Sequence, residues 1–150
     1  MKYIRIRVAA IILNQKKELL LVNHQKNGKS YWLFPGGGIE YGETIEQALK
    51  RELREELSIN MAKISNFVFA HETIYPDLNR HILNVYFKVK IKNNLKFFVK
   101  TDKVLTNAKF FGVDEFKKLL FYPDVKDVII KLWKRDFKFS VGFIKVKWKN

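Results

Sequence analysis

Six of the fifteen acidic residues gather in one stretch of a chain that is otherwise basic. They are Glu40, Glu43, Glu46, Glu52, Glu55 and Glu56. On a helix, which turns by about 100° per residue, Glu52 and Glu56 flank Ile45 on the apolar side and Glu55 falls at its edge. That side also carries Ala48, Leu49, Leu53 and Leu57. Because an ionised carboxylate on a packed face is costly unless something compensates its charge, this arrangement favours a bound cation.

The spacing of three carboxylates indicates which cation. Glu52, Glu55 and Glu56 stand at positions i, i+3 and i+4, and hard oxygen ligands in this arrangement suit Mg²⁺ or Mn²⁺. These ions also take water and the phosphate oxygens of a substrate. The alternative is a solvated acidic helix face that binds nothing.

Four glycines surround the approach to this helix, at positions 36, 37, 38 and 42. Glycine lets the backbone come close to a ligand, and the helix N-terminus that follows offers unpaired N–H groups. A run of three glycines is in most chains only a turn. Here it directly precedes the carboxylate helix, which favours a ligand-binding loop.

The elements that must position these residues can be predicted from the pattern of apolar residues. A helix is expected over 44–57, where Thr44 and Gln47 form a capping-box signature. Strands are expected at 3–13, 19–22, 31–34, 63–71, 81–91, 109–113 and 137–148. The strands at 3–13 and 19–22 are expected to form a hairpin, and residues 23–30 are expected to form a loop. Residues 35–38 should end regular structure, 114–119 should form a helical turn and 124–134 a helix. We therefore expect one α/β domain over residues 1–150.

Composition excludes several classes of protein. The chain has no cysteine, so it has no disulfide scaffold, thiol nucleophile or cysteine-ligated metal, which suits a reducing cytoplasm. The apolar run 8–13 is far too short to span a bilayer, so no membrane association is expected. The 29 basic residues give a formal net charge of +14, which predicts attraction to polyanions such as nucleotides and nucleic acids.

One motif resembles a known family. Gly37, five residues, Glu43, seven residues and then Arg51-Glu52-Leu53-Arg54-Glu55-Glu56 is similar to the signature of the MutT-like Nudix hydrolases, and Phe34-Pro35-Gly36-Gly37 leads into it. The chain departs from the family pattern at Ser58, where a glycine usually ends the helix. The resemblance implies an α/β/α sandwich with a mixed central sheet.

The resemblance also implies an activity. Such enzymes hydrolyse a nucleoside diphosphate linked to another group, with Mg²⁺ or Mn²⁺ bound by Glu52, Glu55 and Glu56 and by the carbonyl near Gly37. Glu43 and Arg51 would form an ion pair that holds the loop against the helix. The catalytic base would be Glu55 or Glu56, with Asp102 as the alternative because it is the one acid between Arg80 and Val113.

The substrate is less well defined by the sequence. Tyr75 could stack on a base and Arg80 could bind a phosphate, although each taken singly is more often a solvated loop residue. Lysines alternating with apolar residues near the C-terminus could bind RNA, or they could mark an edge strand whose lysines block aggregation. The apolar residues of the same strand could pair two chains into a homodimer. We predict a small nucleotide substrate, with an RNA 5′ end or RNA binding as the alternative.

Overall fold

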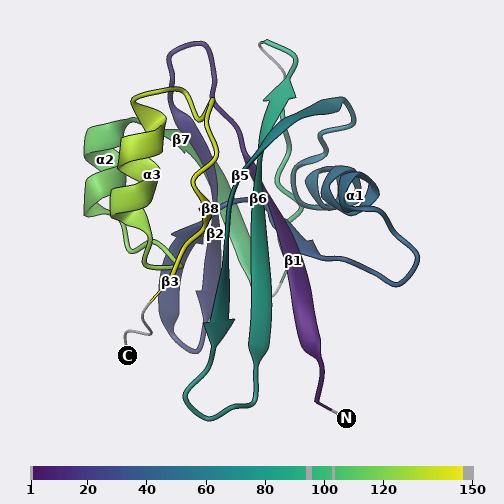
Figure 1. Cartoon of the computed structure of the whole chain (residues 1–150). Coiled ribbons are helices and arrows are strands. Elements are labelled where there is room, and N and C mark those ends of the chain that lie inside the picture. The colour runs from purple at the N-terminus through teal and green to yellow at the C-terminus, as the bar shows by residue number, and fades with distance from the viewer. Residues whose placement is uncertain (1, 94–95, 103, 147–150) are drawn as a thin grey trace.

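The computed structural model describes residues 2–93, 96–102 and 104–146, and Figure 1 shows their arrangement. Within these residues the strands form two sheets. The larger sheet has the order β4-β1-β6-β5-β8, with β4 at Gly36–Gly38, β1 at Ile4–Ile11, β6 at His81–Ile91, β5 at Ala62–Ile74 and β8 at Gly142–Phe143. The smaller sheet has the order β3-β2-β7, with β3 at Lys29–Leu33, β2 at Leu19–Lys26 and β7 at Leu105–Phe111.

The helices lie on opposite sides of the strands. Helix α1, Ile45–Leu57, stands on one side, and α2, Val113–Lys118, stands with α3, Lys126–Trp133, on the other (Figure 1). The larger sheet is mixed, because β1 runs parallel to β6 and antiparallel to β4. The predicted α/β/α sandwich with a mixed central sheet is therefore confirmed. No helix among the described residues is long and apolar enough to cross a bilayer.

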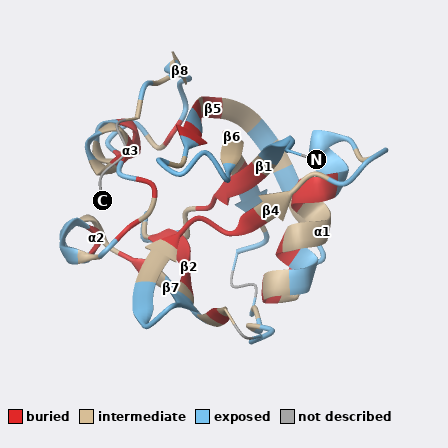
Figure 2. Cartoon of the chain, turned by 90° about the horizontal axis from the view of Figure 1, so that it is seen from below, coloured by how far each residue is buried: buried red, intermediate tan, exposed pale blue. Residues whose placement is uncertain are grey.

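Strand β1 supplies side chains to both layers of the core, since successive residues of a strand point to opposite faces. Val8, together with Ala10 and Ile12, packs in the cluster under α1. Ala9 and Ile11 pack in the second cluster, which includes residues of α3. The buried residues of these elements follow the interior between the layers (Figure 2).

Helix α1 begins as the sequence predicts. Thr44 Oγ1 accepts a hydrogen bond from the Gln47 amide at 3.2 Å, and Gln47 Oε1 accepts one from the Thr44 amide at 2.8 Å. The buried face consists of Ala48, Leu49, Leu53 and Leu57, whereas Ile45 in the first turn is 41% exposed. Ile45, expected on the apolar side of the helix, is therefore not part of its packed face.

Helix α1 ends at Ser58 in the backbone conformation that a glycine at this position would adopt. Ser58 takes the left-handed conformation, with φ of 56°, and its amide donates to the Arg54 carbonyl at 3.0 Å. The Ser58 hydroxyl donates to the Phe98 carbonyl at 3.2 Å. The departure from the family pattern at this position therefore leaves the helix exit unchanged.

Two predictions near the N-terminus were wrong. The first two strands do not form a hairpin within one sheet: β1 and β2 belong to different sheets and meet only at a bridge between Leu13 and Leu19. The expected loop at 23–30 is instead a hairpin, because β2 continues to Lys26 and pairs with β3 across a turn at Asn27 and Gly28. Both of these turn residues have positive φ, which suits a two-residue hairpin loop.

The glycine run was also misread. Gly36–Gly38 forms strand β4, which pairs antiparallel with β1, so the sequence 35–38 does not end regular structure. A Cβ at Gly36 would lie 2.1 Å from the Val8 carbonyl oxygen. This close approach of two backbones is open only to glycine, and it is what brings the loop to the sheet.

The remaining elements differ from expectation mainly at their ends. Strand β7 runs Leu105–Phe111 rather than 109–113, and β5 extends to Ile74. Helices α2 and α3 lie close to their predicted ranges. Of the strand expected at 137–148, only Gly142–Phe143 pairs, parallel to β5, and residues 147–150 lie outside the described part of the chain.

Candidate active site

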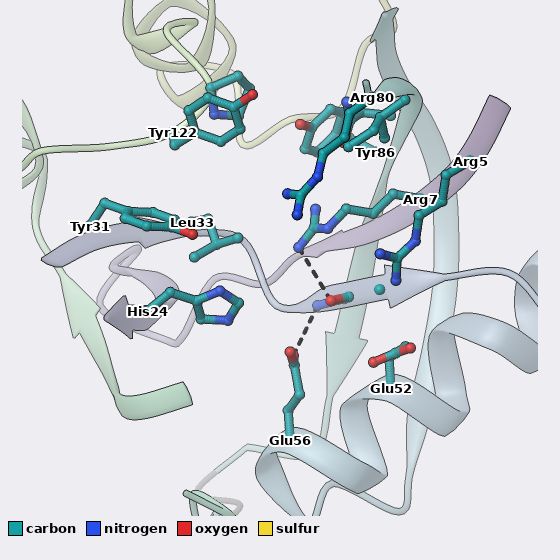
Figure 3. A pocket seen from close by; sticks show the side chains of 15 residues that line it. Arg5, Arg7, His24, Tyr31, Leu33, Glu52, Glu56, Arg80, Tyr86 and Tyr122 are labelled. Carbon is teal, nitrogen blue, oxygen red and sulfur yellow. Dashed lines mark hydrogen bonds between the residues drawn. The ribbon is translucent and has the colours of Figure 1, made fainter. Parts of the chain in front are cut away.

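A cavity of about 320 Å³ opens between the two sheets and α1. Figure 3 shows two carboxylates of α1, Glu52 and Glu56, on one side of this cavity. On another side lie three arginines, Arg5 and Arg7 from β1 and Arg80 from the residue before β6. The far end is formed by less polar groups, among them Tyr31, Leu33, His24 and Tyr122.

Glu56 lies deep in the cavity wall. Its Oε2 accepts a hydrogen bond from the Gly36 amide at 3.0 Å (Figure 3). Burial raises the pKa of Glu56 to about 7, although Arg7 and the Gly36 amide both favour the charged form. The carboxyl group is therefore held where a cation would strongly favour its ionised form.

Glu52 lies against the backbone of the glycine loop. Its side chain is 15% exposed, and a Cβ at Gly37 would lie 2.2 Å from Glu52 Oε1. The same oxygen accepts a hydrogen bond from Arg51 Nη1 at 2.8 Å. The absence of a side chain at Gly37 is what leaves room for this carboxylate.

Glu55 is placed differently from the other two predicted ligands. Its side chain is 59% exposed, does not line the cavity and accepts a hydrogen bond from Arg51 Nη1 at 3.3 Å. Across residues 2–93, 96–102 and 104–146, no three acidic or histidine side chains are grouped closely enough to hold a metal ion. Glu52 and Glu56 nevertheless present hard oxygen donors to one cavity beside Gly37, and Mg²⁺ commonly needs only one or two carboxylates with water and phosphate. The residues present therefore fit such an ion.

Arg51 connects the loop to the helix. Its guanidinium donates to Glu43 Oε1 at 2.7 Å and Oε2 at 3.0 Å, and to the Gly38 carbonyl at 2.9 Å. The hydrogen bonds from Arg51, with one from the Glu40 amide, lower the pKa of Glu43 to about 2. Both predicted partners, Glu43 and Arg51, thus lie in contact at the edge of the site.

The cationic side of the cavity was only partly predicted. Arg80 lines the cavity, whereas Tyr75 does not, and the Arg80 guanidinium lies 5.7 Å from the centre of the Tyr75 ring. Arg7 Nη2 donates to the carbonyls of Phe34 at 2.9 Å and Gly36 at 3.2 Å. Arg5 and Arg7 could have been recognised as polar residues alternating along a strand that continues into a buried run.

The less polar end was missed by the sequence reasoning. The rings of Tyr31 and Tyr122 meet edge to face at 6.2 Å, and those of His24 and Tyr31 at 5.9 Å. Burial, followed by the charge of Arg7, lowers the pKa of His24 below its ordinary value, which favours the neutral ring. No sequence pattern links these residues, because they come from β2, β3 and the segment before α3.

Asp102 lies outside the cavity lining. Its Oδ1 accepts hydrogen bonds from the amides of Val104 and Leu105, both at 2.6 Å. These bonds lower the pKa of Asp102 below its usual value. A carboxylate already satisfied in this way is a poor proton acceptor.

A family model decides the classification. The NUDIX domain model matches residues 4–132, which include every cavity-lining residue named above. The chain belongs to the Nudix family. Among solved structures, a NUDIX hydrolase from Nitrosomonas europaea has the same fold, with a TM-score of 0.75 at 21% identity over 93% of this chain and 94% of that one.

Curated relatives of this Nudix protein carry several names. The RNA pyrophosphohydrolase of Sulfurovum sp. (strain NBC37-1) is 33% identical over 133 residues, 80% of this chain and 78% of that protein. The ADP-ribose pyrophosphatase of Methanocaldococcus jannaschii is 26% identical over 111 residues, which are 73% of this chain and 63% of that protein. The RNA pyrophosphohydrolases of Orientia tsutsugamushi are 43% identical over 60 residues, which are 40% of this chain. The chain therefore spans only 37% of the length of these relatives.

Proposed function

We propose that this Nudix protein is a divalent-metal-dependent pyrophosphohydrolase acting on a small nucleotide. The substrate is a nucleoside diphosphate linked to another group, as in a nucleoside triphosphate, a nucleotide sugar or a dinucleotide. One observation carries the proposal: a single cavity holds Glu52 and Glu56 on one side and three arginines on another. Carboxylates can hold a cation and guanidinium groups can hold phosphate, so the two sides suit the two halves of a metal–diphosphate complex.

Glu52 and Glu56, with the carbonyl of Gly37, are the proposed ligands of Mg²⁺ or Mn²⁺, and Glu55 is the third proposed carboxylate. When bound, the ion supplies charge for the phosphate oxygens and lowers the pKa of water. Arg7 already donates to the carbonyls of Phe34 and Gly36, so it keeps the glycine loop against β1. Its position orients the loop that would meet the substrate.

The proposed catalytic base is Glu56. Glu56 lines the cavity, whereas Glu55 is exposed beside Arg51 and Asp102 is occupied by two backbone amides. A general base must lie within hydrogen-bond reach of the water whose proton it accepts. Of the three acids considered from the sequence, only Glu56 lines the cavity, and this supports its choice as the base.

The size of the cavity suits one bound nucleotide. At about 320 Å³ it stands at the lower end of the range for ligand pockets. The formal charge of +14 and the names of the RNA pyrophosphohydrolase relatives support the alternative, an RNA 5′ end. Charge alone does not separate them, because a basic surface attracts any anion.

A salt series separates the two substrates. We would measure kcat/KM for a nucleotide sugar, a dinucleotide and a 5′-triphosphorylated oligonucleotide at fixed Mg²⁺ over increasing salt. Each single-strand phosphate that the protein neutralises contributes a slope of about 0.7 log unit in affinity per tenfold change in salt. We expect a shallow slope and the highest kcat/KM for a small nucleotide. Best turnover of the oligonucleotide at physiological salt, with a steep loss as salt rises, would contradict the proposal.

Domain organisation, location and assembly are further parts of the proposal. A single domain over 1–150 accords with the family match to 4–132, and the lack of cysteine suits a cytoplasmic location. Phe139, Val141 and Phe143 are exposed near the edge strand β8, where a second copy could pair. Light scattering at micromolar concentration would decide between monomer and homodimer.

A further inference from the structure

One uncharged polar side chain of the cavity wall has no role in the function proposed above. Asn84 lies on β6 beside Arg7 of β1, and on its other side it pairs with the buried His71 of β5. Because paired residues of neighbouring strands share a face of the sheet, the Asn84 side chain stands on the face that carries Arg7. Asn84 lines the cavity together with Arg7 and Tyr86.

The amide of Asn84 is largely buried and has no partner. The residue is only 7% exposed, yet its side chain makes no hydrogen bond to any described residue. Buried polar side chains are nearly always hydrogen-bonded, because an unbonded amide away from water costs free energy. In the described part of the chain, the one side-chain atom that is both sealed from solvent and unbonded is His24 Nε2, so the amide atoms of Asn84 open to the cavity that it lines. They are therefore free to bond a group that enters there.

This amide suits a different part of a substrate from the phosphates. It carries no charge and presents one donor beside one acceptor on a planar group. A phosphate offers only acceptors, so it would leave the Asn84 carbonyl oxygen without a partner. The edge of a nucleobase offers donors beside acceptors, and asparagine can meet one of each at once.

Two flat rings stand on the other side of the cavity. Figure 3 shows Tyr31 and Tyr122 across the cavity from Arg7 and Tyr86, and Asn84 is paired with Arg7 and lies two residues before Tyr86 on the same face of β6. The Tyr122 hydroxyl donates to the Tyr75 hydroxyl at 3.4 Å, which holds the Tyr122 ring from outside the cavity. A nucleobase stacks on such rings, whereas a ribose or a phosphate has no flat face to match them.

We propose that the Asn84 amide binds the hydrogen-bonding edge of the substrate's base, while the face of the base packs on Tyr31 or Tyr122. The inference rests on the proposed function, because it says how the same cavity recognises the nucleoside part of its substrate. Asn84 is thus a residue for specificity, which takes no part in the hydrolysis of the diphosphate.

The first experiment measures binding without metal and without turnover. Calorimetry would compare AMP, GMP, CMP and UMP with ribose 5-phosphate, which has the same sugar and phosphate but no base. Wild type should bind at least one nucleotide about tenfold more tightly than ribose 5-phosphate. Asn84→Leu and Asn84→Ala should each weaken binding of that nucleotide by about fivefold or more, and should change binding of ribose 5-phosphate by less than about twofold.

The second experiment tests whether the contact is with the edge of the base. The favoured nucleotide is compared with its analogue that lacks the exocyclic amino or keto group, which removes a donor or acceptor from the edge and leaves the ring face. Wild type should bind the analogue about fivefold or more weakly than the nucleotide. Both Asn84 variants should bind the two compounds equally, because the partner of the missing group is already gone.

Thermal unfolding distinguishes recognition of a base from a structural role. Asn84 has no hydrogen-bond partner to lose, so Asn84→Leu should keep Tm within about 2 °C of wild type or raise it. Asn107→Leu is the matched control, because it changes an exposed asparagine of β7 that does not line the cavity. It should leave every affinity unchanged.

The outcomes separate this inference from the proposed function. If no pyrophosphate is hydrolysed but binding depends on the base and loses that dependence in both variants, the function is wrong and the role of Asn84 stands. The inference is overturned if wild type binds ribose 5-phosphate as tightly as the nucleotides, or binds the analogue as well as the nucleotide. An equal loss of nucleotide and ribose 5-phosphate in the variants, or a Tm lowered by more than about 4 °C in both, would also overturn it.

Discussion

Arg51 binds Glu43 through two parallel hydrogen bonds, from Nε to Oε1 at 2.7 Å and from Nη2 to Oε2 at 3.0 Å. The same guanidinium donates to Glu52 at 2.8 Å and to the Gly38 carbonyl at 2.9 Å. One side chain therefore fixes the glycine loop to α1 and also sets the position of a carboxylate in the cavity. The ion pair links the stability of the site to its geometry.

Replacing Arg51 with alanine should lower stability. Glu43 and the Gly38 carbonyl lose their partner in a place where their side of the loop is largely shielded from water. We expect Tm to fall by roughly 3–8 °C. Arg54→Ala, an exposed arginine on the same helix, is the control and should change Tm by less than about 2 °C. If Arg51→Ala keeps its Tm but no longer binds metal, the residue acts as part of the metal site instead.

Replacing Glu56 with glutamine should remove activity and retain the fold. The amide oxygen can still accept the Gly36 N–H bond, but the side chain can neither take up a proton from water nor offer a negative charge to the cation. We expect turnover to fall by about two to four orders of magnitude with an unchanged circular dichroism spectrum. Glu46→Gln removes the same charge from an exposed position of α1, where Glu46 pairs with Lys50, and should retain activity. A folded Glu56→Gln protein with normal turnover would exclude Glu56 from the metal site and from catalysis.

Two adjacent glycines should respond differently to alanine. At Gly37 the new Cβ would meet the Glu52 carboxylate at 2.2 Å, and that side chain can move away. Turnover should then fall about tenfold or more while Tm changes little. At Gly36 the new Cβ would meet the Val8 backbone at a φ of +145°, where nothing can move, and we expect a loss of about 3 kcal/mol or more. Equal effects of the two variants on Tm and turnover would contradict this division.

Stability should fall in mild acid because of His71. This ring is fully buried, and Nε2 lies 2.9 Å from the Tyr86 hydroxyl. Burial lowers the pKa of His71 to about 4, from an ordinary value of 6.5, so the unfolded chain takes up a proton more readily than the folded one. The contribution is therefore complete above pH 6.5 and is lost as pH falls from 6.5 through about 4, with a slope of at most about 1.4 kcal/mol per pH unit. Urea denaturation at pH 7, 6 and 5 should show a smaller slope for His71→Gln than for wild type, and parallel curves would exclude this residue as the cause.

Local patterns predicted α1 and most strands because these elements carry their own signals. The cap at Thr44 and Gln47 and the buried run of β1 depend on residues that are neighbours in sequence. Strand β4 has no such signal, since its three glycines have no side chains to alternate and its pairing depends on how closely it can approach β1. The C-terminal alternation predicted a long strand, but only two residues of it find a partner at the sheet edge.

The residues of the site also fall into those that a local motif predicts and those that only the tertiary packing brings together. The motif predicted the carboxylates of α1 and the contact between Glu43 and Arg51 because these lie within one loop and one helix. Arg5, His24 and Tyr122 come together only through the packing of two sheets, and no spacing in the sequence encodes that approach. Arg80 was predicted from its place in a loop near the start of a strand, whereas Tyr75, predicted alongside it, supports Arg80 from outside the cavity.

Strand β1 has one more consequence for the behaviour of the molecule in solution. Its alternate side chains pack into both hydrophobic clusters, and both of its edges are hydrogen-bonded, to β4 and to β6. No partial opening can release one cluster without disturbing the strand that the other also needs. The amide protons of residues 8–11 should therefore exchange with deuterated water only through global unfolding, whereas those of β8 exchange by local opening. The buried half of β1, which directly follows Arg7, is thus a rigid wall beside the site, and we expect adjustment to a substrate in the loops and the helix opposite it.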